Sequence, residues 1–280
     1  MSDRKLKKVL KGRWTMDGAG VRLLRIFANQ DTELLDPFLL LDAFGSTKPD
    51  EYLKGFPFHP HRGMETVTYM LEGKVKHRDS LGNTGEIGPG DLQWMSAGSG
   101  ILHEEMPQKS PNGVSGLQLW VNLPRAEKMK APEYLDALSA SIPTVKTDKG
   151  LVRPIAGSFM GTAGPLATIS RNPSYFDIHL DGDALINLPT IPSHTAFAFA
   201  YEGELGLEGA EDFYTQSCLV FGPGDEVNLR AGSGGCRFIF ASAEPLHESV
   251  AWGGPIVMNT KEELETAFKD LEQGTFIKDK

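Results

Sequence analysis

The chain has 280 residues, of which 40% are hydrophobic and 23% are charged, and its formal net charge is −9. This length and composition favour a globular protein of two domains. The acidic balance excludes broad binding to nucleic acid, which needs a basic surface, and no apolar run approaches the roughly 20 residues that span a membrane.

The N-terminal segment is the one basic stretch of the chain, and we interpret it as a solvated arm rather than a nucleic-acid-binding or targeting element. No apolar stretch typical of a signal peptide follows it. Two cysteines in such a chain indicate a reduced protein, so we expect a cytoplasmic location and small core thiols within strands. The residues concerned are Lys5, Lys7, Lys8, Lys11 and Arg13 in the arm, and the cysteines Cys218 and Cys236.

Most of the chain reads as short strands separated by Gly, Pro, Asn and Asp. The candidate strands are short and rich in β-branched, aromatic or leucine residues, as strands commonly are. Many short strands joined by tight turns are typical of a barrel or sandwich. Examples lie at residues 21–27, 38–41, 66–71, 117–121, 196–201 and 237–241.

Two segments of the N-terminal half hold side chains that bind metals. His59 and His61 lie two residues apart, as do His103 and Glu105. Residues i and i+2 of a strand project from the same face, so each pair can point into one barrel interior. Three imidazoles and one carboxylate suit iron, manganese, nickel, copper or zinc, whereas magnesium and calcium prefer oxygen ligands.

Other residues near these segments compete for the same roles. Glu65 shares the strand parity of His59 and His61, so it also qualifies as the carboxylate ligand, whereas Glu104 should face away from His103. His77 follows the first motif on the next expected strand and is a minor candidate for the barrel interior. The remaining histidines are expected at surface or structural positions, and they are His179, His194 and His247.

An internal repeat divides the chain. Residues 89–100 read PGDLQWMSAGSG and residues 223–234 read PGDEVNLRAGSG, with seven of twelve positions identical. An apolar strand ending in Glu-Gly precedes each copy. This pattern predicts a duplicated barrel, with residues 1–135 as the first domain and 136–280 as the second.

The second copy serves as a control for the metal site. Aligning the AGSG segments places Arg237 and Ile239 where His103 and Glu105 lie. Aligning the Glu-Gly pairs places Pro189 and Ile191 at the positions of His59 and His61. We therefore predict that only the first domain binds a metal ion.

A short helix is predicted near the C-terminus, from residue 260 to 273. Thr260 and Glu263 form a capping-box pattern. Leu264, Phe268 and Leu271 recur at three- and four-residue spacing, so they form one apolar face that should pack on a barrel.

At this point the motifs identify a family. The segments HPHRGMETVTYMLEG, HRDSLGNTGEIGPGDLQWMSAGSGILHEEM and GLQLWVNLP resemble those of pirin, a member of the cupin superfamily. The resemblance extends from about Leu23 to the GPIVMNTKEEL segment at 254–264. It implies an all-β fold of two tandem antiparallel, jelly-roll-like cupin barrels with a short C-terminal α-helix. The general cupin pattern nominates Glu65 as a ligand, whereas the pirin pattern nominates Glu105 with His59, His61 and His103.

The resemblance also implies a function, that of a mononuclear Fe(II) protein acting as a quercetin (flavonol) 2,3-dioxygenase, with Zn, Mn, Ni and Cu as alternative metals. Its partners would be a flavonol and O2, with Glu105 as metal ligand and catalytic base. Many relatives carry Asp where this chain has Phe58, which predicts a more apolar pocket mouth. The candidates for the apolar wall are Phe56, Phe58, Trp94 and Met95, with barrel core as their alternative role.

Two other functions use the same four ligands. The first is a metal- or redox-dependent regulator that binds a transcription factor or metabolic enzyme without catalysis, and the second is a cupin with a purely structural metal. The acidic composition argues against direct DNA binding in either case. We expect a monomer.

Overall fold

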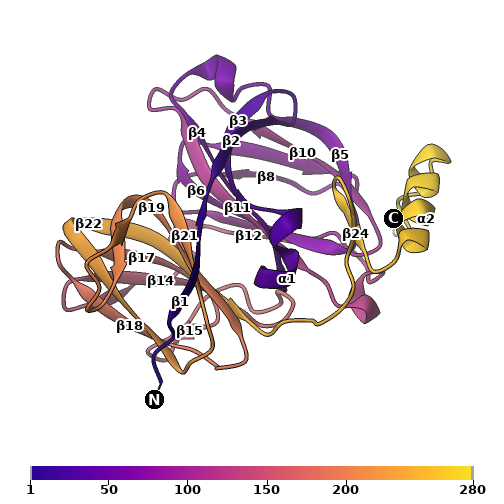
Figure 1. Cartoon of the computed structure of the whole chain (residues 1–280). Coiled ribbons are helices and arrows are strands. Elements are labelled where there is room, and N and C mark those ends of the chain that lie inside the picture. Colours follow the sequence, from indigo (N-terminus) through magenta and orange to yellow (C-terminus); the bar gives the residue numbers. More distant parts are fainter. Residues whose placement is uncertain (1, 279–280) are drawn as a thin grey trace. The chain divides into compact units, whose positions relative to one another are not determined.

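The structure is a computed structural model that describes residues 2–278, and its strands form two compact units (Figure 1). The first barrel comprises Arg13–Ser139 and Leu246–Lys280, and the second barrel comprises Met1–Gly12 and Ala140–Pro245. Strands dominate both units, which confirms the all-β prediction. None of the helices within residues 2–278 is long and apolar enough to cross a membrane.

The first barrel is built from a seven-stranded and a four-stranded antiparallel sheet. The seven-stranded sheet has the order β12-β9-β6-β11-β4-β3-β2, and the four-stranded sheet has the order β5-β10-β7-β8. The strands are β2 (Arg13–Asp17), β3 (Val21–Phe27), β4 (Phe38–Ser46), β5 (Phe56–His61), β6 (Met64–Glu72), β7 (Val75–Asp79), β8 (Thr84–Ile87), β9 (Leu92–Ser96), β10 (Ile101–Pro107), β11 (Val114–Asn122) and β12 (Glu133–Ala137), with a short helix α1 (Thr32–Leu35) before β4.

Strand pairing in the four-stranded sheet brings the two metal-binding motifs together. β5 and β10 are antiparallel neighbours, with His103 opposite His59 and Ile101 opposite His61. The register shifts between His103 and Glu105, so Glu105 lies opposite Phe56. Such an irregularity re-aims a side chain within a strand.

The second barrel is formed around one nine-stranded sheet with an apolar core. Its main path is β1-β21-β19-β22-β17-β14-β13, with β18 paired to β22 and β20 to β19. The strands are β1 (Leu6–Lys11), β13 (Val145–Thr147), β14 (Gly150–Ala156), β17 (Ser174–Leu180), β18 (Leu185–Pro189), β19 (Thr195–Leu207), β20 (Phe213–Tyr214), β21 (Ser217–Phe221) and β22 (Glu226–Ala243), beside the two-stranded pair β15 (Ser158–Phe159) and β16 (Thr162–Ala163). Cys218 and Cys236 are buried in β21 and β22, as predicted.

The two units are not continuous halves of the chain, in contrast to the expected division into 1–135 and 136–280. The N-terminal segment is a strand and not a free arm, because β1 pairs along β21 from Leu6 to Lys11. Its lysines still lie mostly exposed. At the other end, residues 246–280 belong to the first barrel. The division of function between a metal-binding and a metal-free domain stays a prediction.

The C-terminal segment contributes a hairpin and a helix to the first barrel. The hairpin joins β23 (Ala251–Gly253) to β24 (Ile256–Met258), and α2 (Lys261–Glu272) follows beside β24 (Figure 1). Thr260 and Glu263 form the predicted capping box. Leu264 and Leu271 pack against a buried cluster around Ile256, whereas Phe268 is 39% exposed.

Candidate metal centre

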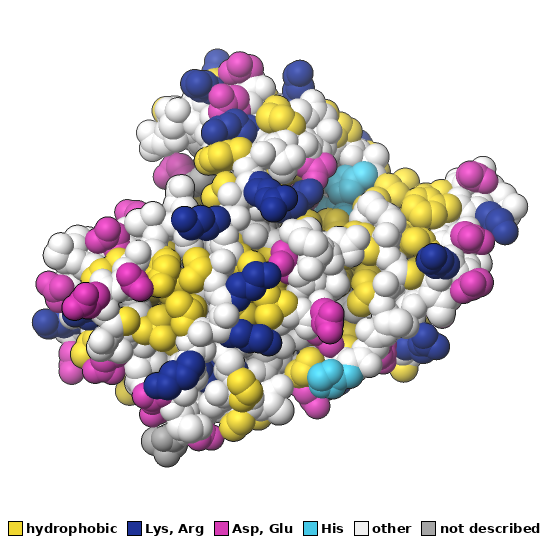
Figure 2. Space-filling model, viewed as in Figure 1, with side chains coloured by type: hydrophobic (Ala, Val, Ile, Leu, Met, Phe, Trp, Pro, Cys, Tyr) yellow, Lys and Arg dark blue, Asp and Glu magenta, His cyan; other side chains and the backbone are white. Residues whose placement is uncertain are grey.

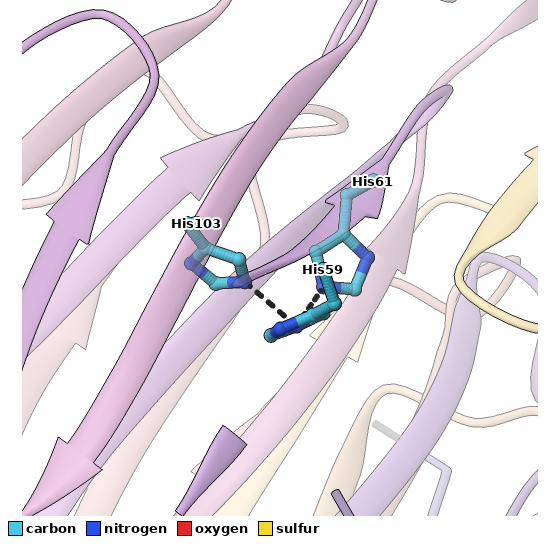
Figure 3. A group of neighbouring side chains, drawn as sticks. All are labelled: His59, His61 and His103. Carbon is cyan, nitrogen blue, oxygen red and sulfur yellow. Dashed lines mark hydrogen bonds between the residues drawn. The ribbon is translucent and has the colours of Figure 1, made fainter. Parts of the chain in front are cut away.

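Three histidines converge on one point of the first barrel. His59, His61 and His103 each offer a ring nitrogen within 4.8 Å of the others (Figure 3). The Nε2 atom of His59 lies 3.0 Å from the Nε2 atoms of both His61 and His103. The strand parity inferred for His59 and His61 and the pairing of β5 with β10 together account for this geometry.

Backbone carbonyls define the tautomers of two of these rings. The Nδ1 atom of His59 lies 2.9 Å from the Pro57 carbonyl oxygen, and that of His61 lies 3.0 Å from the Pro255 carbonyl oxygen. A carbonyl only accepts, so each Nδ1 carries a proton, and in its neutral form each ring presents a bare Nε2 lone pair. Two facing lone pairs at 3.0 Å do not form a hydrogen bond, whereas a cation between them would satisfy both.

Burial keeps the inner two rings neutral. His61 and His103 are 2% and 1% exposed. Burial, helped by His59, lowers the pKa of His61 to about 3. Burial and the neighbouring imidazoles also hold the pKa of His103 well below its ordinary value. Neutral imidazole is the form that coordinates metal ions.

Glu105 lies beside this group in the same pocket, but its carboxylate is held by other side chains. Gln118 donates from Nε2 to both carboxylate oxygens at 3.0 Å, and the Thr68 hydroxyl donates to Oε1 at 3.2 Å. The cluster of possible metal-ligand side chains consists of His59, His61 and His103 and does not include Glu105. Its predicted role as fourth ligand therefore stays a prediction.

The competing candidates occupy distinct positions. Glu65 is buried with its Oε1 3.7 Å from Lys130 Nζ. Glu104 accepts from Arg78 at the surface, facing away from His103 as expected. His77 is buried behind the triad, with its ring centroid 5.2 Å from that of His103.

A cavity of about 650 Å³ leads to the histidines. Its wall is largely apolar and aromatic, with polar groups at a few points. Figure 2 shows imidazole surface (cyan) bordered by hydrophobic side chains near the position of β5 and β24 in Figure 1. The residues that line it include Phe44, Phe56, His59, His61, Glu105, Gln118, Trp120 and Trp252.

Of the four candidates for the pocket wall, one lines the cavity and two have the alternative role of barrel core. Phe56 lines the cavity, but Trp94 and Met95 are buried in the core at 2% and 1% exposure. Phe58 is 44% exposed beneath the Arg78 guanidinium and does not line the cavity. Phe58 differs from the prediction because adjacent residues of a strand point to opposite faces, and its neighbour His59 points into the cavity.

Two kinds of pocket residue were missed. Gln118 and Trp120 lie two apart on β11, so strand parity in the GLQLWVNLP segment offered a signal for them. Trp252 and Pro255 lie more than 130 residues after Trp120 in the sequence, and only the tertiary structure reveals them. Trp252 stacks on Trp120 with ring centroids 6.0 Å apart.

The residues present fit a first-row transition metal. A cation with metal–nitrogen bonds of about 2.1 Å holds two imidazole nitrogens at a right angle about 3.0 Å apart. That spacing matches the two Nε2–Nε2 distances around His59. His59, His61 and His103 would hold such an ion, and Glu105 is a carboxylate of the same pocket.

Comparisons with known proteins agree with this architecture. The family model described as Pirin matches residues 20–121, and the Pirin C-terminal cupin domain matches residues 175–277. A pirin-like protein of Caulobacter vibrioides is 43% identical over 99% of this chain and 100% of its own length. Mouse pirin is 40% identical over 96% of this chain and 93% of its own. The crystal structure of a quercetin 2,3-dioxygenase from Acinetobacter baumannii superposes with a TM-score of 0.90 at 31% identity, covering 98% of this chain and 99% of that one.

Proposed function

The chain belongs to the pirin family of two-barrel cupins, and from that premise we propose that it is a mononuclear iron protein acting as a flavonol 2,3-dioxygenase. The observation that carries the proposal is the convergence of three imidazoles beside a largely apolar cavity, which His59 and His61 line. The similarity to a structure named quercetin 2,3-dioxygenase supports the same reaction class.

The cavity suits a flat aromatic substrate. Its volume of about 650 Å³ lies in the range of roughly 300–1,000 Å³ that is common for small-molecule sites. Phe44, Phe56 and the stacked pair Trp120 and Trp252 offer ring faces and edges for packing. These side chains would also exclude water from the reacting carbons.

Glu105 is the residue that we assign to proton transfer. A flavonol carries a hydroxyl next to a ketone, and removal of the hydroxyl proton makes the ring electron-rich toward O2. The buried Glu105 carboxylate would take that proton, while Gln118 and Thr68 keep it oriented. An iron ion held by the histidines would supply Lewis acidity toward the deprotonated oxygen and redox chemistry toward O2.

The decisive experiment measures flavonol oxidation under air by the iron-loaded protein, with carbon monoxide release as the readout. We expect turnover by the wild type and a loss of about 10²–10⁴-fold in Glu105→Gln, because an amide cannot accept the proton. Metal content is measured in parallel, so that a loss of iron is not mistaken for a loss of the base.

Glu104→Gln is the matched control. The Glu104 carboxylate is next to Glu105 in the chain but binds Arg78 at the surface, so its loss should not affect turnover. Unchanged turnover in Glu105→Gln with iron retained would show that Glu105 is not the base. If the iron-loaded wild type oxidises no flavonol, the proposed reaction is wrong and a non-catalytic, metal-dependent regulator becomes the better hypothesis.

A further inference from the structure

We propose that the C-terminal segment, residues 250–276, is an integral part of the metal centre, with Arg62 as the positioning residue that clamps it there. Metal binding and docking of this segment would then stabilise each other. The inference rests on the metal site of the proposed function but not on its substrate.

The first contact is made directly to a metal-ligand candidate. His61 donates from Nδ1 to the carbonyl oxygen of Pro255, which lies between β23 and β24, at 3.0 Å. This hydrogen bond aims Nε2 at the other histidines and sets its tautomer. Partners of this kind orient ligating imidazoles and raise their basicity. The orientation of His61 therefore depends on where the C-terminal hairpin lies.

Arg62, the next residue, ties that hairpin and helix α2 to the strand of His61. Its side chain is 2% exposed and donates to the Ser99 carbonyl at 2.6 Å, to Asp270 Oδ2 at 2.8 Å and to the Phe276 carbonyl at 2.8 Å. The guanidinium also lies 4.2 Å from the centroid of the Phe276 ring. One buried cation thus links β5, the turn before β10 and the C-terminal segment.

Backbone contacts hold the same segment in register. The Val257 amide donates to the Arg62 carbonyl at 3.0 Å. The ammonium of Lys128 bridges the carbonyls of Gly63 and Val257, at 2.7 and 3.0 Å. A Cβ at Gly63 would lie 2.1 Å from the Val257 carbonyl oxygen, so no other side chain fits this approach. The hairpin is therefore packed tightly against the end of β5.

The other side of the hairpin faces the substrate cavity. Trp252, Gly254 and Pro255 line the cavity, and Trp252 stacks on Trp120. The segment therefore contributes both a ligand-orienting carbonyl and part of the cavity wall. Metal binding and docking of the segment depend on the same groups. Each must therefore favour the other by the same factor.

The test uses the full-length protein and the metal alone. Affinity for Fe(II), and for Co(II) with its visible spectrum, is measured by chelator competition for the wild type, Arg62→Lys and Lys278→Ala. Arg62→Lys keeps the charge but loses the fork of donors, so we expect affinity to fall about 10- to 100-fold with an altered Co(II) spectrum. Lys278→Ala is the matched control, because Lys278 binds the same Asp270 carboxylate without contacting the metal motif.

The reciprocal measurement needs no Arg62 variant. Hydrogen exchange of residues 250–276 in the wild type should slow when metal is added, and should not change in the His59→Ala, His61→Ala double variant. Exchange that ignores the metal, or a folded Arg62→Lys that keeps wild-type affinity, overturns the inference. Coupling without flavonol oxidation would leave the inference standing while the proposed reaction falls.

Discussion

In the second barrel, aliphatic and aromatic side chains fill the interior, whereas in the first barrel a cavity of about 650 Å³ takes that place. Phe176, Phe238 and Phe240 are at most 3% exposed within one apolar cluster of the second barrel. The first barrel instead directs His59, His61 and Glu105 toward its cavity. The comparison teaches that one strand framework supports either a packed core or a reactive pocket, depending on which side chains point inward.

The comparison also corrects the alignment of the two copies. The alignment without gaps places Arg237 and Ile239 at the positions of His103 and Glu105. In β22, however, Phe238 and Phe240 belong to the core cluster, so the side chains of Arg237 and Ile239 point to the opposite face. A shift of one residue exchanges the faces of a strand. At these two positions of the second barrel the inward side chains are thus phenylalanines, which offer no metal-ligand atom.

The largest effect is expected when metal-ligand candidates of the first barrel are removed. We expect about one metal ion per chain in the wild type and none in the His59→Ala, His61→Ala double variant, measured by elemental analysis. Affinity should fall roughly 10³-fold or more, because about 10–16 kcal/mol of binding is shared among few ligands. The His179→Ala variant of the second barrel should keep its metal. Two ions per wild-type chain would contradict the prediction that only the first barrel binds metal.

The next largest effect is expected when a core side chain of the second barrel is truncated. Phe238 is fully buried, so Phe238→Ala should lower the free energy of unfolding by about 3–5 kcal/mol. Phe44→Ala, at the edge of the first barrel's cavity, should cost only about 1–2 kcal/mol, because that side chain is already partly exposed. Urea denaturation measures both values. Equal losses would show that the first barrel is as tightly packed as the second.

A smaller effect is expected when a polar side chain that orients Glu105 in the first barrel is removed. Gln118→Ala removes both of the amide hydrogen bonds to Glu105. We expect metal affinity to fall about 10- to 100-fold, as for other groups that orient a ligand. Chelator competition provides the measurement. An unchanged affinity in a folded variant would indicate that Glu105 is not a ligand or does not need Gln118.

The smallest effect concerns pH. Hydrogen bonds from Lys278 and Arg62 lower the pKa of Asp270 to about 2, from 3.8. The folded state therefore favours the carboxylate, and this stabilisation is complete above pH 4 and is lost as the pH falls toward 2. The side chain is partly exposed, so we expect about 1 kcal/mol. Urea denaturation at pH 5 and pH 3 should show a smaller loss in Asp270→Asn than in the wild type.

The local features of this protein were readable from its sequence. Strand-like segments, the capping box of Thr260 and Glu263, and the shared face of His59 and His61 all depend on residues close together in the chain. Alternation along a strand and the spacing of a helix turn are short-range properties, so the pattern of residues predicts them. Even the meeting of His103 with His59 followed from pairing two strands that both carry histidine motifs.

The sequence by itself therefore determined the two barrels and the histidines of the candidate site. Only the tertiary structure decided what surrounds them: Gln118 on Glu105, Pro255 on His61 and Trp252 against Trp120. It also decided that β1 joins the second barrel and residues 246–280 join the first. These contacts join segments distant in the chain, and their choice depends on which buried surfaces fit together, a property that no local pattern of residues contains.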